Sequence, residues 1–171
     1  SRGDFSVQVV RAWAPRGADR FHNLVHNGFY DGTRFYRAVS GFVVQWGVHG
    51  DPQVTQAWAR QCIADDPVRR TNARRTLTFA FGQPDTRTTQ VFINLGMNTR
   101  LDQLGFTPMG EVIEGMPTVD SLYTGYGDRP PAGQGPDPMQ LVEQGNEYLE
   151  REFPLLDSIV RARITTSGIR P

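Results

Sequence analysis

Lysine is absent from this chain of 171 residues: all 18 basic residues are arginines, and they are balanced by 18 acidic residues. Because a guanidinium is not an amine nucleophile, no side chain is suited to Schiff-base chemistry. A formal net charge of zero argues against a dedicated nucleic-acid-binding protein, which normally carries an excess of basic residues. Cys62 is the only cysteine, so no disulfide can form within the chain.

Long hydrophobic runs are also missing. No apolar stretch approaches the roughly 20 residues that a membrane-spanning helix needs. Hydrophobic residues make up 38% of the chain and charged residues 21%, which is typical of a soluble globular protein. We expect residues 1–171 to form one domain with a sizeable core. The sequence indicates no compartment; we expect a soluble protein that is either cytoplasmic, or exported or organellar after removal of a targeting segment.

Short strands dominate the pattern that remains. Alternation of apolar and polar residues predicts a strand over 5–13, and apolar spacing predicts a helix over 15–28. Further strands are predicted over 33–39, 42–45, 77–80, 90–94, 109–113 and 159–165. The segment 47–72 has little periodicity and predicts a long surface excursion, with one helical turn near Trp58.

The last third of the chain is richer in glycine, proline and helical spacing. A short helix is predicted over 117–122, a loop over 125–138 and a helix over 139–153. Many short strands with few helices predict a closed barrel, because closure removes exposed sheet edges.

One strand carries an unexpected charge. Arg37 lies in an apolar strand, and Gln45 lies in the apolar strand that follows. An unpaired buried charge is costly, so Arg37 is either paired structurally or kept for its positive charge and its rigid set of donors. This makes it the first candidate for a functional residue.

The segment from Phe35 to Gly47, with the pattern Phe-x-Arg-x-x-x-Gly-Phe-x-x-Gln-x-Gly, resembles the signature of the cyclophilins, the cyclosporin-type peptidyl-prolyl isomerases. The strand before it, the helix and residues 28–33 also match in order and spacing. Three downstream pieces resemble further parts of the family pattern: 77–80, 88–93, and 101–102 followed by 108–116. The resemblance runs from about Phe5 to about Leu122 and continues weakly through the tail. It implies a mainly β fold, a closed eight-stranded antiparallel barrel capped by two helices. The loop 48–70 would extend from it, and residues 125–155 would form a loop and helical insertion before the last strand.

The implied activity is peptidyl-prolyl cis-trans isomerisation. Rotation about an X-Pro bond is slow because amide resonance must be broken, and breaking it returns the lone pair to the proline nitrogen. A fixed donor aimed at that nitrogen binds the twisted state better than either planar state, so no nucleophile, general base, metal or cofactor is needed. His22 and His26 lie one helical turn apart, but two residues alone favour a solvated helix face over a metal site.

The resemblance assigns roles residue by residue. Arg37 is the expected donor to the proline nitrogen, and Gln45 is expected to orient Arg37 and to bond a substrate carbonyl. The expected walls of the proline pocket are Phe42, Val43, Phe92, Leu101 and Phe106. The backbone of Ala80 and Phe81 is expected to bind the peptide, with Gln90 beside them.

Three positions depart from the family pattern. Val43 stands where many members have methionine, Phe106 replaces a pocket histidine, and Arg100 occupies the position of the tryptophan found in cyclosporin-sensitive members. We therefore expect weak or no cyclosporin binding. Tyr36 replaces a frequent histidine, and alternation along the strand predicts that it points away from the face of Arg37.

Two functions are therefore in play. The first is an isomerase acting on proline-containing polypeptides, which the retention of Arg37, Phe42, Gln45 and Phe92 favours. The second is a cyclophilin-fold binding or scaffold subunit with little or no activity, held in a larger assembly through 48–70 and 125–155. Nucleic acid is not an expected partner.

Overall fold

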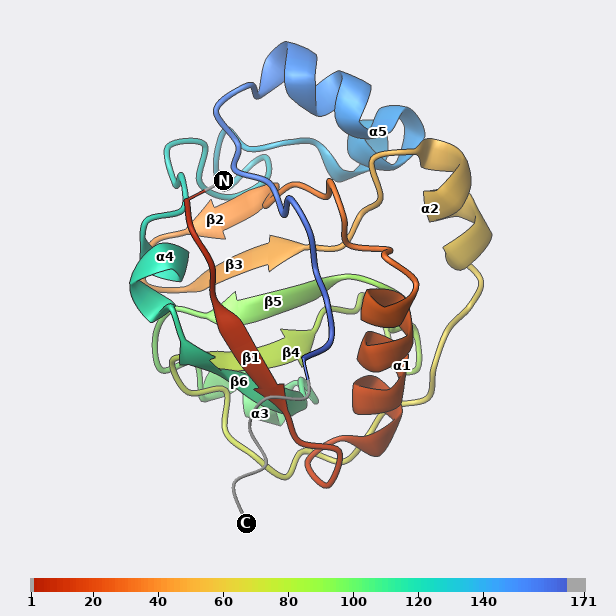
Figure 1. Ribbon diagram of the computed structural model, residues 1–171, viewed down its shortest axis with the longest axis vertical. Helices are drawn as coiled ribbons and strands as arrows, with labels where there is room; N and C mark the ends of the chain where they lie inside the picture. The colour runs from red at the N-terminus through yellow and green to blue at the C-terminus, as the bar shows by residue number, and fades with distance from the viewer. Residues whose placement is uncertain (1, 166–171) are drawn as a thin grey trace.

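The fold is built around one antiparallel sheet. In the computed structural model, which describes residues 2–165, six strands follow the order β1-β6-β4-β5-β3-β2. The strands are β1 (Ser6–Val9), β2 (Arg37–Val39), β3 (Val43–Trp46), β4 (Thr76–Phe79), β5 (Val91–Asn94) and β6 (Pro108–Glu114). The helices are α1 (Pro15–His26), α2 (Pro52–Trp58), α3 (Arg100–Gln103), α4 (Met116–Asp120) and α5 (Pro138–Glu152). Figure 1 shows α1 beside the sheet, with α5 beyond the β2 edge.

The expected closed eight-stranded barrel is not what forms. Within residues 2–165 the sheet has six strands, and β1 and β2 are its edge strands, each paired with one neighbour only. Two further segments approach each other: Phe35 N donates to Asp157 O at 3.0 Å, and Ile159 N donates to Thr33 O at 2.9 Å. This pairing reaches only one isolated bridge, between Arg34 and Ser158. It is too short to extend the sheet, and the strand predicted over 159–165 is absent.

The core explains why the predicted strands form. All four residues of β3, β4 and β5 are buried, as expected for strands covered on both faces. The main apolar cluster joins these strands to Leu24 of α1 and to Phe29 and Tyr30, which follow the helix. Burying side chains of this size stabilises the fold by about 1.5–3 kcal/mol each. The outer strand β1 is mostly exposed.

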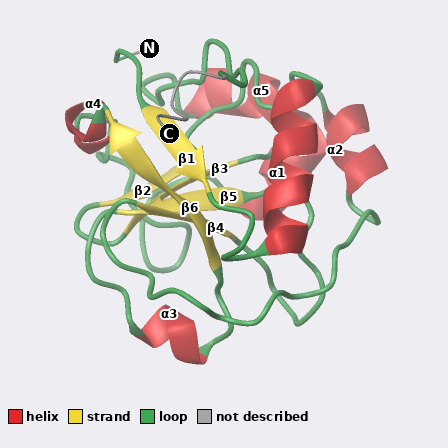
Figure 2. Cartoon of the chain, turned by 60° about the horizontal axis from the view of Figure 1, so that its bottom comes forward, coloured by secondary structure: helices red, strands yellow, loops and turns green. Residues whose placement is uncertain are grey.

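Helices α2 and α5 lie side by side although they are far apart in the sequence. Both α2 and α5 begin with an Asp-Pro pair, and Asp51 and Asp137 cap them by accepting bonds from backbone N–H groups. Inside α5, Gly145 has a φ of 58°, and a Cβ there would collide with the Gly50 carbonyl. That close approach joins α5 to the loop before α2, and Figure 2 shows the two helices on the same side of the molecule.

Most element predictions are confirmed within a few residues. The helix predicted over 139–153 is α5, and that predicted over 117–122 is α4. The surface excursion holds the full helix α2 rather than one turn, and the single-turn helix α3 was not predicted. Within residues 2–165, no helix is long and apolar enough to cross a bilayer.

Candidate active site

Arg37 and Gln45 lie opposite each other on neighbouring strands. The register of β2 on β3 pairs them directly, and Gly41, with a φ of 70°, makes the turn between the strands. Side chains at paired positions share one face of a sheet. Arg37 Nη1 accordingly donates to Gln45 Oε1 at 3.1 Å. This hydrogen bond is the contact through which Gln45 is expected to orient the guanidinium.

A polar network lies behind this pair. Gln45 Nε2 donates to the Tyr36 hydroxyl at 2.8 Å and to Gln90 Oε1 at 3.2 Å, and the Tyr36 hydroxyl donates to Gln90 Oε1 at 2.6 Å. Both N–H groups of Gln45 are thus engaged within the protein, and its carbonyl is left to accept from Arg37. Burial raises the pKa of the Tyr36 phenol, so Tyr36 stays a neutral donor.

The predicted direction of Tyr36 was wrong. We expected it to point away from the face of Arg37, yet its hydroxyl reaches Gln45. Tyr36 precedes the first residue of β2, so strand alternation does not govern it. Its ring packs in the cluster beneath α5, and the phenol is long enough to cross back to the network.

Arg37 also has an acidic partner that the sequence did not indicate. Asp128 accepts from Arg37 Nε at 2.6 Å and from Nη2 at 3.0 Å, so its carboxylate meets the guanidinium along one edge. The Arg37 and Asp128 side chains are 20% and 22% exposed. The hydrogen bond from Arg37 is the main cause that lowers the pKa of Asp128, which therefore stays ionised at neutral pH.

An apolar cluster lies beside the guanidinium. Three of its members are buried and three are half-buried: Val43, Phe92 and Leu101, with Phe42, Ala80 and Phe106 around them. Phe42 connects the cluster to the charge, because Arg37 Cζ lies 5.5 Å from its ring centroid. Phe81 extends the surface by stacking on Phe106, with ring centroids 4.2 Å apart.

A buried amide holds the Phe106 side of the cluster in place. Asn72, which is fully buried, donates to the Phe106 carbonyl at 2.8 Å and to Asp102 Oδ1 at 2.7 Å. Its own carbonyl accepts from Thr78 and Asn94 on the adjoining strands. Such satisfied buried networks fix one arrangement of the backbone, so the rim carrying Phe106 is tied to the sheet.

All ten predicted site residues lie in this one region. Arg37, Gln45 and Gln90 belong to the polar network, and the other seven belong to the apolar cluster or stack on it. Arg100 stands at the rim, exposed, with its Cζ 5.1 Å from the centroid of the Phe42 ring. Asp128 is the residue that sequence reasoning missed. It lies 91 positions from Arg37, in a segment without apolar periodicity, so no local signal marked it.

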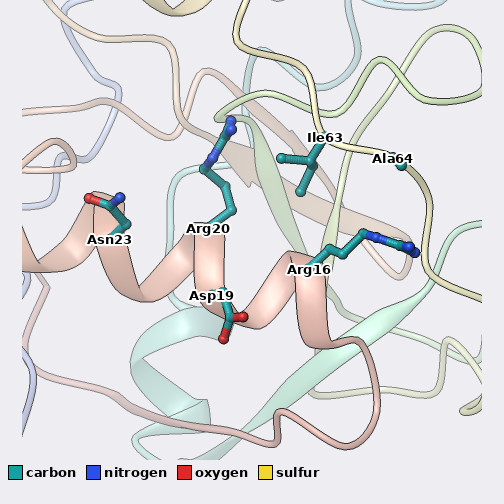
Figure 3. Close-up of a pocket in the computed structure, with 6 residues that line it drawn as sticks. All are labelled: Arg16, Asp19, Arg20, Asn23, Ile63 and Ala64. Carbon is teal, nitrogen blue, oxygen red and sulfur yellow. The ribbon is translucent and has the colours of Figure 1, made fainter.

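A separate groove lies on α1 and contains none of the predicted residues. It has a volume of about 370 Å³ and is lined by Arg16, Asp19, Arg20, Asn23, Ile63 and Ala64 (Figure 3). The two arginines of the groove make structural hydrogen bonds to the backbone. Arg20 Nη1 donates to the Gln61 and Thr88 carbonyls at 2.6 and 3.0 Å, and Arg16 donates to the Asp65 carbonyl. We interpret the groove as the junction at which hydrogen bonds hold the segment 61–65 against α1.

Metal ligands do not gather anywhere in residues 2–165: no group of three histidine, cysteine or acidic residues there is arranged to hold an ion. His22 and His26 stack with ring centroids 6.1 Å apart on the surface of α1.

Known proteins resemble this chain across the region that builds the site. Residues 1–143 match the family described as cyclophilin type peptidyl-prolyl cis-trans isomerase/CLD. The peptidyl-prolyl cis-trans isomerase CYP18-1 of Arabidopsis thaliana is 34% identical over 139 residues, covering 75% of this chain and 83% of that protein. The human peptidyl-prolyl cis-trans isomerase-like 3 is 30% identical over 126 residues, covering 70% and 76%.

A solved structure agrees on the fold. The cyclophilin-type isomerase of Cryptosporidium parvum, crystallised in the presence of the dipeptide Ala-Pro, superposes with a TM-score of 0.62 at 23% identity. The match covers 78% of this chain and 89% of the other. On the family match and the identity to curated isomerases, this chain belongs to the cyclophilin-type peptidyl-prolyl cis-trans isomerases.

Proposed function

We propose that this chain accelerates rotation about X-Pro bonds through Arg37. The rotation barrier is about 18–20 kcal/mol because the planar amide is resonance-stabilised. In the twisted state the proline nitrogen regains its lone pair, and an oriented N–H donor stabilises that state more than either planar one. The observation that carries the proposal is a guanidinium hydrogen-bonded to Gln45 at 3.1 Å beside a partly exposed apolar cluster.

The cluster supplies the binding half of the site. Phe42, Ala80 and Phe106 are half-buried, so each presents a face on which the ring can pack. Because Phe42 also lies 5.5 Å from Arg37 Cζ, a proline on the cluster would hold its nitrogen next to the guanidinium. Val43, Phe92 and Leu101 form the floor of the proposed pocket.

The polar groups divide into peptide binding and orientation. Ala80 N donates to the Gln90 carbonyl at 2.9 Å, so we assign peptide binding to the carbonyl side of Ala80 and to the Phe81 backbone. Gln45 keeps both N–H groups on Tyr36 and Gln90, which supports its orienting role over the expected bond to a substrate carbonyl.

The proposed substrates are proline-containing polypeptides, the class to which the Ala-Pro dipeptide used with the Cryptosporidium protein belongs. Contacts with an assembly through 48–70 and 125–155 stay a prediction. These two segments would act as one surface, since Asn146 N donates to the Gly50 carbonyl at 2.9 Å.

A protease-coupled assay on a proline-containing peptide tests the proposal with wild type, Arg37→Ala and Arg11→Ala. Arg11 is a matched control, since its exposed guanidinium pairs with the exposed Asp19, which lines the separate groove on α1. Removing a single transition-state donor costs about 10²–10³ in rate. We expect that loss for Arg37→Ala only. Equal rates for wild type and Arg37→Ala would remove the catalytic assignment of Arg37.

A further inference from the structure

Asp128 belongs to the segment between α4 and α5, where the structure has no strand or helix over 121–137. This segment follows Leu122, where the sequence motifs end, although the family match extends to residue 143. Its carboxylate nevertheless makes two hydrogen bonds to the proposed catalytic guanidinium, at 2.6 and 3.0 Å. Charge-assisted bidentate pairs of this kind are among the strongest and most directional hydrogen bonds in proteins.

The segment is built to hold Asp128 in place. Asp128 Oδ1 also accepts from Arg129 N at 2.8 Å, and the Asp128 carbonyl accepts from Gly135 N at 2.8 Å. A Cβ on Gly133 would collide with the same carbonyl, so the chain folds back on itself too closely for a larger residue. The carboxylate is therefore presented by a closed turn rather than by a freely moving loop.

Aromatic packing anchors this turn to the rest of the molecule. The Tyr126 ring lies 5.0 Å from the Tyr123 ring and 5.0 Å from the Phe153 ring at the end of α5. Tyr126 packs against the cluster that contains Tyr36. The same apolar cluster thus supports Asp128 on one side of Arg37 and the Tyr36–Gln45 network on the other.

Some N–H groups of the Arg37 guanidinium are not used by Asp128 or Gln45. A guanidinium has five N–H groups. Among residues 2–165, Asp128 takes the one on Nε and one on Nη2, and Gln45 takes one on Nη1. One N–H on Nη1 and one on Nη2 remain for a substrate. The Asp128 contact therefore lies on the Nε edge and leaves donors at the tip of the fork.

We propose that Asp128 is a positioning residue for catalysis, which fixes the guanidinium of Arg37 so that the tip of its fork meets the proline nitrogen. The inference rests on the proposed isomerase function. Gln45 alone holds Arg37 by one bond, about which the group can still turn. Adding the carboxylate fixes the guanidinium plane before substrate arrives, which removes a rotational cost from the transition state.

The test uses the full chain and three variants, Asp128→Asn, Asp128→Ala and Asp128→Glu. Exchange NMR on a bound proline peptide measures the rotation rate on the enzyme, and a shift titration measures the dissociation constant. We expect the bound rate to fall about ten-fold in Asp128→Asn and Asp128→Ala, with the dissociation constant within two-fold of wild type. A ten-fold loss corresponds to about 1.4 kcal/mol. Asp128→Glu should recover part of the rate, because glutamate can remake the bidentate pair.

Asp120→Asn is the control. It removes the charge from an exposed ion pair in which Arg74 Nη2 lies 2.7 Å from Asp120 Oδ2, so the bound rate should not change. The nearly isosteric Asp128→Asn keeps the test decisive if Asp128→Ala fails to fold. A bound rate within two-fold of wild type in Asp128→Asn overturns the inference, and so does a rise in rate, which would mean that the carboxylate competes with substrate.

The two proposals fail in different ways. An inactive wild type refutes the isomerase function itself, and an active wild type that does not need Arg37 refutes the proposed role of Arg37. An active wild type that needs Arg37 and ignores Asp128 refutes only the positioning role.

Discussion

Replacing Tyr36 with phenylalanine removes one oxygen atom from the centre of the network behind Arg37. That hydroxyl accepts from Gln45 Nε2 at 2.8 Å and donates to Gln90 Oε1 at 2.6 Å. Gln45 is only 8% exposed, so the N–H that loses its acceptor finds little water. Gln90 is half-buried and can turn to solvent.

The loss of unfolding free energy depends on which polar group is left without a hydrogen-bond partner. A buried donor without a partner costs about 1–3 kcal/mol, and this is the expected loss of unfolding free energy in Tyr36→Phe. A chain of this length loses about 2–4 °C of melting temperature per kcal/mol, so the midpoint should fall by about 2–12 °C. The ring itself stays, so the apolar cluster beneath α5 should not be disturbed.

The activity should fall by less than the loss of Arg37 itself. Gln45 keeps one bond to Gln90 at 3.2 Å but can now turn its amide, which loosens its hold on Arg37 Nη1. We expect kcat/KM to drop by about three- to ten-fold, equivalent to roughly 0.7–1.4 kcal/mol. Calorimetry and the protease-coupled assay on one preparation give both quantities. A stable Tyr36→Phe variant with unchanged kcat/KM would refute the idea that this network orients Arg37.

Three further predictions concern stability and binding. Burial raises the pKa of both Tyr30 and Tyr36, so these phenols ionise in the unfolded state before they ionise in the folded state as the pH rises. The free energy of unfolding should therefore fall above about pH 10. Unfolding curves at alkaline pH should show a smaller fall for Tyr36→Phe. Asn72→Ala removes a hydrogen-bond partner from buried groups on β4 and β5, so the free energy of unfolding should fall by at least about 2 kcal/mol in denaturant titrations. It should also weaken peptide binding, because Asn72 holds the rim that carries Phe106. With Arg100 at the rim, cyclosporin should inhibit weakly; nanomolar inhibition in a titration would contradict this.

The sequence predicted the parts of the site that neighbouring strands create. Arg37 and Gln45 lie eight positions apart across a hairpin, so their pairing follows from strand alternation and a glycine turn. The apolar residues of β3 and β5 were also recognisable, because a signature pattern carries them and burial of the strands brings them together. Short-range patterns in the sequence were sufficient to predict that these residues lie together.

Tertiary contacts explain what was missed. The Arg37–Asp128 pair joins β2 to a turn whose position depends on α5 and on the packing of Tyr126, and no periodic pattern encodes that. Closure of the barrel was expected from the family, but it depends on how far 157–159 pair with 32–35, and that pairing stops after one bridge. The helix α3 has only four residues, too few to leave a periodic signal.

The central claim is that Arg37 acts on the twisted bond rather than on the binding of the peptide. The most direct test measures, for wild type and Arg37→Ala, the rotation rate of a bound proline peptide by exchange NMR and its dissociation constant by titration. Our account predicts a bound rate about 10²-fold lower in Arg37→Ala, with a dissociation constant within about three-fold of wild type. A variant that binds far more weakly yet rotates its bound peptide at the wild-type rate would contradict it.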